Sequence, residues 1–243
     1  MLTLLKKEIN SFLNSLIGYI VIIVFLMITG LSLWVIHSGF NIPDYGYASL
    51  SSLFSLAPWV FLILIPAVTM RLFADEKKTG TIEILLTKPI SDLQIILAKY
   101  FAGLILVIFS LLPTLIYFFS IYQLGEDKGN IDLGGMWGSY IGLLFLGAAF
   151  TSIGVFASSI SENQIISFIV SIFLCGFIYQ GFEAISSLKL FGNIDLFIKQ
   201  LGIDAHYASV SRGVIDTRDV LYFLSVIILF ILLTKFTLGS RKW

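Results

Sequence analysis

Six long apolar segments divide this chain of 243 residues, and most polar residues lie in the stretches between them. The apolar segments cover about residues 17–36, 53–70, 96–122, 137–158, 165–181 and 220–238. Each is long enough to cross the hydrocarbon core of a bilayer as a helix. The pattern therefore predicts an all-α integral membrane protein, with six transmembrane helices in a single transmembrane domain over residues 1–243.

Residues 1–16 have the spacing of an amphipathic helix. One face is apolar, with Leu2, Leu5, Ile9, Phe12, Leu13 and Leu16, and the other faces carry Lys6, Lys7, Glu8, Asn10 and Asn14. We expect an interfacial helix that lies along the membrane surface. The apolar segment that follows is about twice as long as the core of a signal peptide, so we interpret it as a permanent first span.

Charge is concentrated in the stretch 71–99, which reads RLFADEKKTGTIEILLTKPISDLQIILAK. Thr79, Ile82 and Leu86 follow i, i+3, i+7 spacing, and the polar faces are supplied by Asp75, Glu76, Lys77, Lys78 and Glu83. This spacing predicts an amphipathic helix at the membrane surface. Gly80 permits a backbone break and Pro89 ends the helix, while Ser91 and Gln94 fit a capping box that begins the next one. We therefore expect residues 71–95 to form a structured surface segment.

Two other stretches have patterns of their own. In the segment 137–158, Gly147, Thr151, Gly154 and Ser158 recur at i, i+4, i+7 and i+11, which predicts a smooth face for close helix packing. The helix that packs there could belong to this chain or to a second subunit. The outer loop 182–219 is rich in apolar residues in its first half, and we expect it to re-enter the outer half of the membrane as short helices.

Composition supports membrane insertion and restricts the chemistry. Hydrophobic residues make up 58% of the chain and charged residues 12%, whereas soluble domains average about 25% charged residues. Mean hydropathy is +0.97. The formal net charge is zero, so no nucleic-acid partner is indicated.

The distribution of basic residues predicts the orientation in the membrane. Ten lie on the side of the two termini and five on the other. The ten are Lys6, Lys7, Arg71, Lys77, Lys78, Lys88, Lys99, Lys235, Arg241 and Lys242; the five are Lys128, Lys189, Lys199, Arg212 and Arg218. Since basic residues favour the cytoplasmic side, both termini and the stretch 71–99 are expected in the cytoplasm.

Patterns for catalysis are missing from the sequence. There is no P-loop, no H-E-x-x-H and no G-x-S-x-G motif. We expect the six membrane cores to lack ionisable groups, which argues against an ion-coupled transporter, and we interpret His37, Glu183 and His206 as interface or surface residues. The single cysteine, Cys175, has no partner for an internal disulfide. The chain is expected to be no enzyme and to hold no cofactor or metal. If it does work against a gradient, the energy must come from another protein.

The order Arg71, Glu76, Gly80, Thr81, Glu83, Leu85, Leu86, Pro89, Ser91 and Lys99 resembles the segment between the second and third spans of ABC-2-type transporter permeases. In that family this segment meets the ATPase subunit. The resemblance implies ATPase-coupling roles for Arg71, Glu76, Gly80, Thr81, Glu83, Leu86, Pro89 and Lys99. It also implies a cytoplasmic ABC ATPase that binds ATP and Mg, a second permease copy in a homodimer, an auxiliary periplasmic or membrane subunit, and a place in the bacterial inner membrane.

Two further stretches narrow the resemblance. The opening LLKKEINSFLNSLIGYIV and the run SRGVIDTRDVLYF at 211–223 look like the permease of the gliding-motility-associated ABC transporter, which is closely similar to permeases for nitrous-oxide reductase maturation. The expected function is an exporter-type permease linked to gliding motility. The alternatives are a permease for copper-enzyme maturation and a non-transporting scaffold of a motility or secretion apparatus. Lipid-linked, peptide and polysaccharide cargo suit the apolar spans equally.

Overall fold

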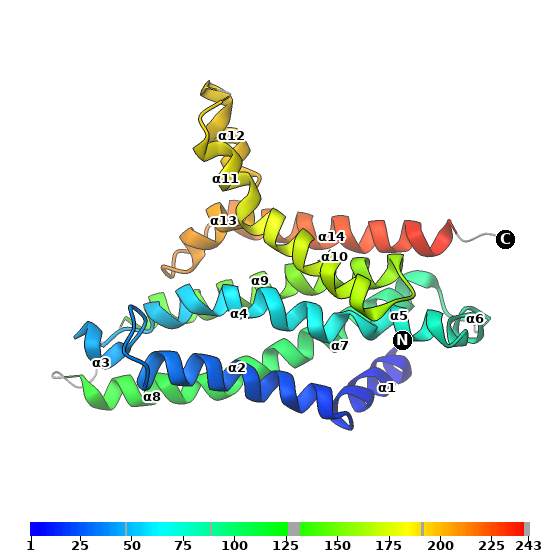
Figure 1. Cartoon of the computed structure of the whole chain (residues 1–243), viewed down its shortest axis with the longest axis horizontal. Coiled ribbons are helices and arrows are strands. Elements are labelled where there is room, and N and C mark those ends of the chain that lie inside the picture. Colours follow the sequence, from blue (N-terminus) through cyan, green and yellow to red (C-terminus); the bar gives the residue numbers. More distant parts are fainter. Residues whose placement is uncertain (47, 88, 126–131, 191, 241–243) are drawn as a thin grey trace.

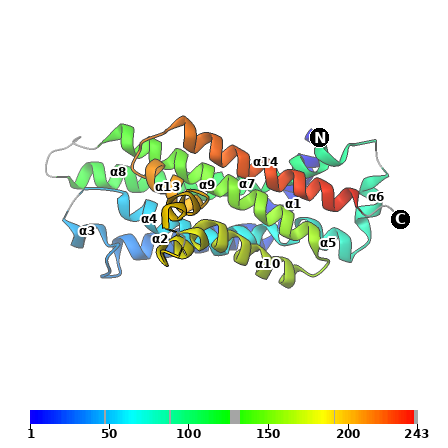
Figure 2. The same cartoon turned by 90° about the horizontal axis from the view of Figure 1, so that it is seen from above.

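The computed structural model describes residues 1–46, 48–87, 89–125, 132–190 and 192–240, and every regular element in these residues is helical. The long helices lie side by side along one axis (Figures 1 and 2). Within the described part, six helical segments are long and apolar enough to cross a membrane: Leu16–Trp34, Ser51–Lys78, Asp92–Leu124, Leu133–Ile160, Gln164–Ser187 and Thr217–Gly239. The prediction of an all-α protein with six spans is confirmed.

The first half of the chain runs through α1 (Leu2–Leu13), α2 (Leu16–Trp34), α3 (Ile42–Tyr45), α4 (Ser51–Thr69), α5 (Arg71–Lys78), α6 (Thr81–Leu86), α7 (Asp92–Leu111), the 3-10 turn η1 (Leu112–Thr114) and α8 (Leu115–Leu124). The second half runs through α9 (Leu133–Ile160), α10 (Gln164–Gly176), the π-helix η2 (Phe177–Gly181), α11 (Phe182–Ser187), η3 (Gly192–Ile194), α12 (Asp195–Gln200), α13 (Ile203–Val210) and α14 (Thr217–Gly239). The expected apolar segments overlap α2, α4, α7 with α8, α9, α10 with η2, and α14, in that order.

Local sequence explains where several helices begin. Ser15, Asp132, Asn163 and Asp216 each precede a long helix, and each side chain accepts a hydrogen bond from a backbone N–H of the first turn. Such caps satisfy donors that the helix itself leaves unpaired. At the start of α7, the Ser91 hydroxyl and the Gln94 side chain form the reciprocal capping box that the sequence predicts.

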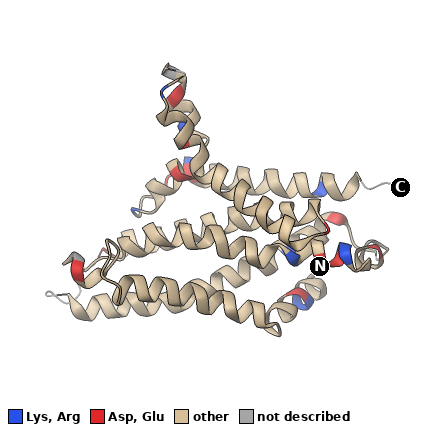
Figure 3. Ribbon diagram, viewed as in Figure 1, with Lys and Arg blue, Asp and Glu red and all other residues tan. Residues whose placement is uncertain are grey.

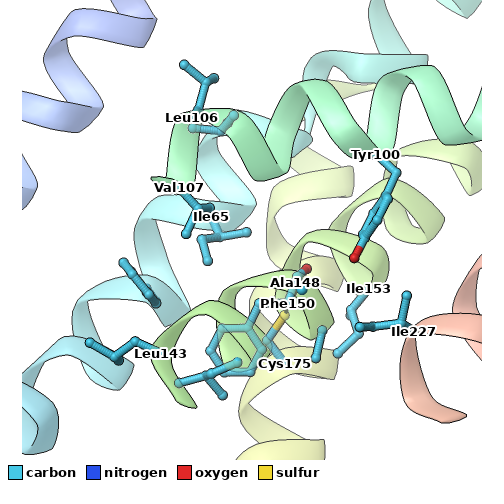
Figure 4. Packing of buried hydrophobic residues seen from close by; sticks show 14 of the residues in the cluster. Ile65, Tyr100, Leu106, Val107, Leu143, Ala148, Phe150, Ile153, Cys175 and Ile227 are labelled. Carbon is cyan, nitrogen blue, oxygen red and sulfur yellow. Dashed lines mark hydrogen bonds between the residues drawn. The ribbon is translucent and has the colours of Figure 1, made fainter. Parts of the chain in front are cut away.

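Helix α9 lies in the centre of the bundle and packs against α4, α7, α10 and α14. Its small residues permit this: a Cβ on Gly154 would lie 2.8 Å from Thr69 Cβ of α4, and one on Gly147 would lie 2.7 Å from Val107 Cγ1 of α7. Thr151 and Ser158, on the same face, are fully buried. The small-residue face therefore receives α4 and α7 of the same chain. Figure 4 shows Val107 of α7 beside Ile65 of α4, with Phe150 of α9 and Cys175 of α10 in the same core.

A proline in α4 leaves one backbone carbonyl without a partner in the helix, and a residue distant in sequence donates a hydrogen bond to it. Pro58 has no N–H, so the carbonyl of Phe54, one turn earlier, has no partner within the helix. The hydroxyl of Tyr207, on α13, donates to this carbonyl at 2.7 Å. Tyr207 is buried, and burial raises its pKa well above the ordinary value. Helix α13 is thereby fixed to the N-terminal half of α4.

Helices α11 and α12 form a hairpin that projects sideways from the bundle (Figure 1) and is seen end-on in the second view (Figure 2). Large apolar side chains on it are exposed, namely Leu188, Leu190, Ile194, Leu196 and Phe197. Charged residues of the described part lie mainly at the two ends of the bundle and on this hairpin, and the middle of the bundle is almost free of them (Figure 3).

Candidate functional site

The amine of Lys99 is buried where α1, α5 and α7 meet. Only 1% of its side chain is exposed, and Nζ lies 3.2 Å from Glu8 Oε1 and 2.9 Å from Glu76 Oε2. Nζ also donates to the Leu72 carbonyl at 2.7 Å and lies 5.1 Å from the centre of the Phe73 ring. The expectation that the membrane cores lack ionisable groups is wrong at Lys99, which falls within the segment 96–122. Two carboxylates and a carbonyl make burial of this charge possible.

Like Lys7, Glu8 is a residue of this charged group that the sequence did not reveal. We expected it on a polar face of the first helix, but the residues of α1 that are buried are Leu4, Glu8 and Phe12, while Leu2 and Leu16 are exposed. The prediction was wrong because the buried line follows i, i+4, i+8 toward α7, and the partner of Glu8 is 91 residues away. The available signal was Lys99 itself, since a cation in an apolar helix requires a buried anion.

Two more cations complete the cluster. Lys7 Nζ lies 3.3 Å from Glu8 Oε1 and 3.2 Å from Glu76 Oε1. Partial burial lowers the pKa of Lys7, but attraction by these two carboxylates outweighs burial and raises it above the ordinary value. Arg71 donates to the Ser15 hydroxyl at 2.9 Å and lies 4.6 Å from the centre of the Phe12 ring. We call Lys7, Glu8, Arg71, Glu76 and Lys99 the polar cluster.

On its other side, α5 is fixed to α9 and α10. The Ser158 hydroxyl accepts from the backbone N–H groups of Phe73 and Ala74, at 2.9 and 3.1 Å, and donates to the Met70 carbonyl at 2.8 Å. Ser158 thus caps α5 from a neighbouring helix. Lys77 was expected on an exposed polar face but is buried, and its amine donates to the Ser159 carbonyl at the end of α9. The Asp75 carboxylate accepts from the Gln164 amide of α10.

Helix α6 leaves this packed region. Gly80 joins it to α5 with φ of +70°, a left-handed conformation that glycine adopts without strain. Ile82 and Leu85 are buried, whereas Thr81, Glu83 and Ile84 are exposed, Ile84 by 64%. Pro89 is exposed beyond the helix. Leu86 ends α6, and its side chain is outside the described ones.

The structure therefore separates the sequence-predicted residues into two groups. Arg71, Glu76 and Lys99 meet in the polar cluster, beside a cleft of about 230 Å³ between α1, α5 and α7. The second group is exposed on α6 and its flanking residues, and consists of Gly80, Thr81, Glu83 and Pro89. Of the four small residues on α9, Ser158 contacts α5 directly, while Gly147, Thr151 and Gly154 lie deeper in the bundle.

The charges of the polar cluster pair with one another and so connect neighbouring helices. The polar cluster holds three cations and two carboxylates, and its carboxylates already face cations. In the described residues no group of three or more His, Cys, Asp or Glu side chains is placed to hold a metal ion. What the site offers is the attachment of one short helix, α5, to α1 and α7 through Lys7 and Lys99, and to α9 and α10 through Ser158 and Gln164.

Comparison with known proteins identifies the family. The family model described as ABC-2 family transporter protein matches residues 37–202, which is more than half of the chain. No curated protein matches the chain. The matched region extends from the loop before α3 to the end of the sideways hairpin and includes α5, α6 and the central helix α9. This membrane-embedded chain belongs to the ABC-2 family of transporter proteins, as a permease subunit of an ABC transporter whose ATPase is a separate chain.

Proposed function

We propose that the ATPase subunit docks on α6 and that α5 and the polar cluster pass its movement to the membrane helices. The observation that carries this proposal is a contrast between two adjacent helices. Helix α5 is held by polar contacts to α1, α7, α9 and α10, made by Lys7, Lys99, Ser158 and Gln164, whereas α6 presents exposed side chains. A segment that is rigid on one side and accessible on the other is suited to transmit force.

The exposed face of α6 suits a protein partner. Ile84 is an apolar side chain, 64% exposed, on a segment in which charged residues are concentrated. Glu83 lies beside it and is also exposed. An apolar anchor next to a charged residue is a combination that binding partners use, because the apolar group fills a pocket and the charge fixes the register.

The polar cluster would transmit movement of α5 to α1 and α7, because its contacts keep these helices together. Removing one partner of a buried ion pair costs about 3–5 kcal/mol, so the contacts among Glu8, Glu76 and Lys99 resist separation. When α5 is displaced, α1 and α7 move with it. This couples the partner at α6 to the interfacial helix and to the third span together.

The test compares exposed positions that lie on and off α6. Glu83→Ala and Ile84→Ala should leave the amount of inserted protein unchanged but reduce the amount of ATPase subunit that co-purifies and the ATPase rate of the complex. Gly80→Pro should reduce both more strongly, because it alters the direction of α6. The matched control is Glu162→Ala in the exposed turn between α9 and α10. Equal loss from Glu162→Ala, or full binding by both α6 variants, would contradict the proposal.

We further propose an exporter-type permease of the bacterial inner membrane, with both termini in the cytoplasm, that forms a homodimer and is linked to gliding motility. The orientation is supported by the excess of basic residues on the side of the termini. The link to motility is supported by the run at 211–223 and by the opening of the chain, which resemble the gliding-motility-associated permease. The same resemblance implies an auxiliary subunit. Loss of gliding on deletion of the gene, restored by wild type and not by Ile84→Ala, is the expected result.

A further inference from the structure

His206 connects three helices at the base of the sideways hairpin. Its Nδ1 lies 2.7 Å from Asp219 Oδ1, in the first turn of α14, and its Nε2 lies 2.9 Å from the carbonyl oxygen of Gln200, the last residue of α12. The imidazole stacks on the ring of Tyr222, with centroids 3.9 Å apart. The Tyr222 hydroxyl donates to the neighbouring Leu201 carbonyl at 2.6 Å.

Both ring nitrogens of His206 face oxygens that accept hydrogen bonds. A backbone carbonyl has no proton to donate, and neither has an ionised carboxylate. The imidazolium donates to both oxygens, whereas neutral imidazole has a single N–H and would turn a lone pair toward the other oxygen. The contacts are therefore complete only when His206 is protonated. A cation here also faces the C-terminal carbonyls of α12, where positive charge is favourable.

The geometry of α13 shows what this contact adds. Helix α13 has separate attachments to the bundle, through the hydrogen bond from Tyr207 to Phe54 and through the Ser139 hydroxyl, which donates to the Ser211 carbonyl at 2.7 Å. The α11–α12 hairpin is connected to α13 through Gln200, Leu201 and Gly202, which we call the Gln200 joint. His206 and Tyr222 bond the two carbonyls of this joint, and so tie the end of α12 to α14.

Other charged groups near this joint are directed elsewhere. Asp204, on α13, faces Tyr179 and Glu183; burial, and then its contact with Glu183, raises the pKa of Asp204 above its ordinary value. Lys199 of α12 pairs with Glu183 at 2.9 Å. On α14, the Asp216 carboxylate accepts from the backbone N–H of Arg218. Asp219, of which 10% of the side chain is exposed, is the charge that faces the imidazole.

We propose that His206 is a proton-dependent clasp that fastens the α11–α12 hairpin to α14. With His206 protonated, both contacts hold and the hairpin is fixed. Loss of the proton as pH rises removes one donor and the attraction to Asp219, and the hairpin gains freedom. Imidazole ordinarily changes charge between about pH 5 and pH 8, so we expect the clasp to respond within this range.

The test measures hairpin mobility with a spin label. In the full chain carrying Cys175→Ala, a nitroxide is attached at Leu196→Cys, an exposed position on α12. Spectra are recorded in lipid nanodiscs at about pH 5.5 and about pH 8.5, on either side of the ordinary imidazole range. The label should be less mobile at the lower pH. His206→Gln should abolish this difference, and the matched control His37→Gln, which removes the other histidine of the chain, should keep it.

A second pair of variants separates the clasp from other causes. Asp219→Asn keeps an oxygen acceptor but removes the charge, so the mobility change should move to lower pH. Asp204→Asn should keep the change at its wild-type pH. A wild-type label equally mobile at both pH values, an unaltered response in His206→Gln, or a response lost in Asp204→Asn would overturn the proposal. If His206→Gln fails to fold, the direction of the Asp219→Asn shift decides.

Discussion

At the scale of single residues, the buried amine of Lys99 gives the clearest energetic argument. Its charge is removed from water and compensated by Glu8, Glu76 and the Leu72 carbonyl. Exposed ion pairs contribute about 0–1 kcal/mol, whereas breaking a buried pair costs about 3–5 kcal/mol because the remaining charge has no partner. The chain contains both kinds, since Lys199 and Glu183 form an ion pair on the surface with 46% and 38% of their side chains exposed.

We predict that Lys99→Met lowers the free energy of unfolding by about 3–5 kcal/mol, while the control Lys199→Met lowers it by about 0–1 kcal/mol. Adding Glu8→Gln and Glu76→Gln to Lys99→Met should restore part of the loss, since no carboxylate is then left with only the exposed amine of Lys7 as its cation. Unfolding in mixed micelles of increasing denaturing-detergent content measures all three. Equal losses of stability for the two lysine variants would show that the Lys99 ion pairs contribute no more than an exposed pair does.

At the scale of helices, close packing around α9 depends on residues that lack side-chain bulk. Gly154 lies against Thr69, and Gly147 against Val107. Protein interiors have little free volume, so an added methyl group at such a contact shifts a neighbour or strains the helix. Gly239, near the end of α14, has no heavy atom within 4 Å of the place where a Cβ would lie.

We predict opposite effects of alanine at these two glycines. Gly239→Ala should be neutral or stabilise by up to about 1 kcal/mol, because alanine is the better helix former. Gly154→Ala should destabilise by about 1–3 kcal/mol through overpacking. Thr69→Ala in the same chain should relieve that loss. Thermal unfolding in detergent distinguishes these outcomes, and a neutral Gly154→Ala would show that α4 and α9 are not closely packed at this glycine.

The same scale shows which features the sequence could predict. The spans, the break at Gly80 and the capping box at Ser91 depend on neighbouring residues, so their pattern is visible along the chain. The burial of Glu8 and Lys77 depends on partners far away in sequence, Lys99 and Ser159. Helical periodicity assigns a residue to a face but does not say which face another helix covers. The residues of the polar cluster were therefore found only in part.

At the scale of the whole molecule, charged residues gather at the two ends of the bundle and are nearly missing between them in the described part (Figure 3). The polar cluster and α6 lie at one end, and α3 lies at the other (Figure 3). The proposed orientation places the first end in the cytoplasm. The side chain of Lys77 cannot report on this orientation, because it is buried against α9, whereas Lys78 is exposed next to it.

We predict that, in the Cys175→Ala background, a membrane-impermeant thiol reagent labels Asp44→Cys in intact cells and labels Lys78→Cys only after the membrane is opened. The reason is the excess of basic residues at the end that contains α5. Lys77→Cys is the internal control and should react poorly on either side. Labelling of Lys78→Cys in intact cells would reverse the orientation.

The hydrogen bond from Tyr207 to Phe54 has a consequence for how the protein is made. The two residues are 153 positions apart, and chains are synthesised at about 5–20 residues per second, so roughly 8–30 s separate the appearance of the carbonyl from that of its final donor. During this interval α4 has already left the ribosome with an oxygen that its own backbone leaves unpaired. Newly inserted α4 must keep that oxygen near water, or near a temporary partner in the insertion machinery, until α13 arrives. Assembly of α13 against α4 is thus ordered in time by a single proline.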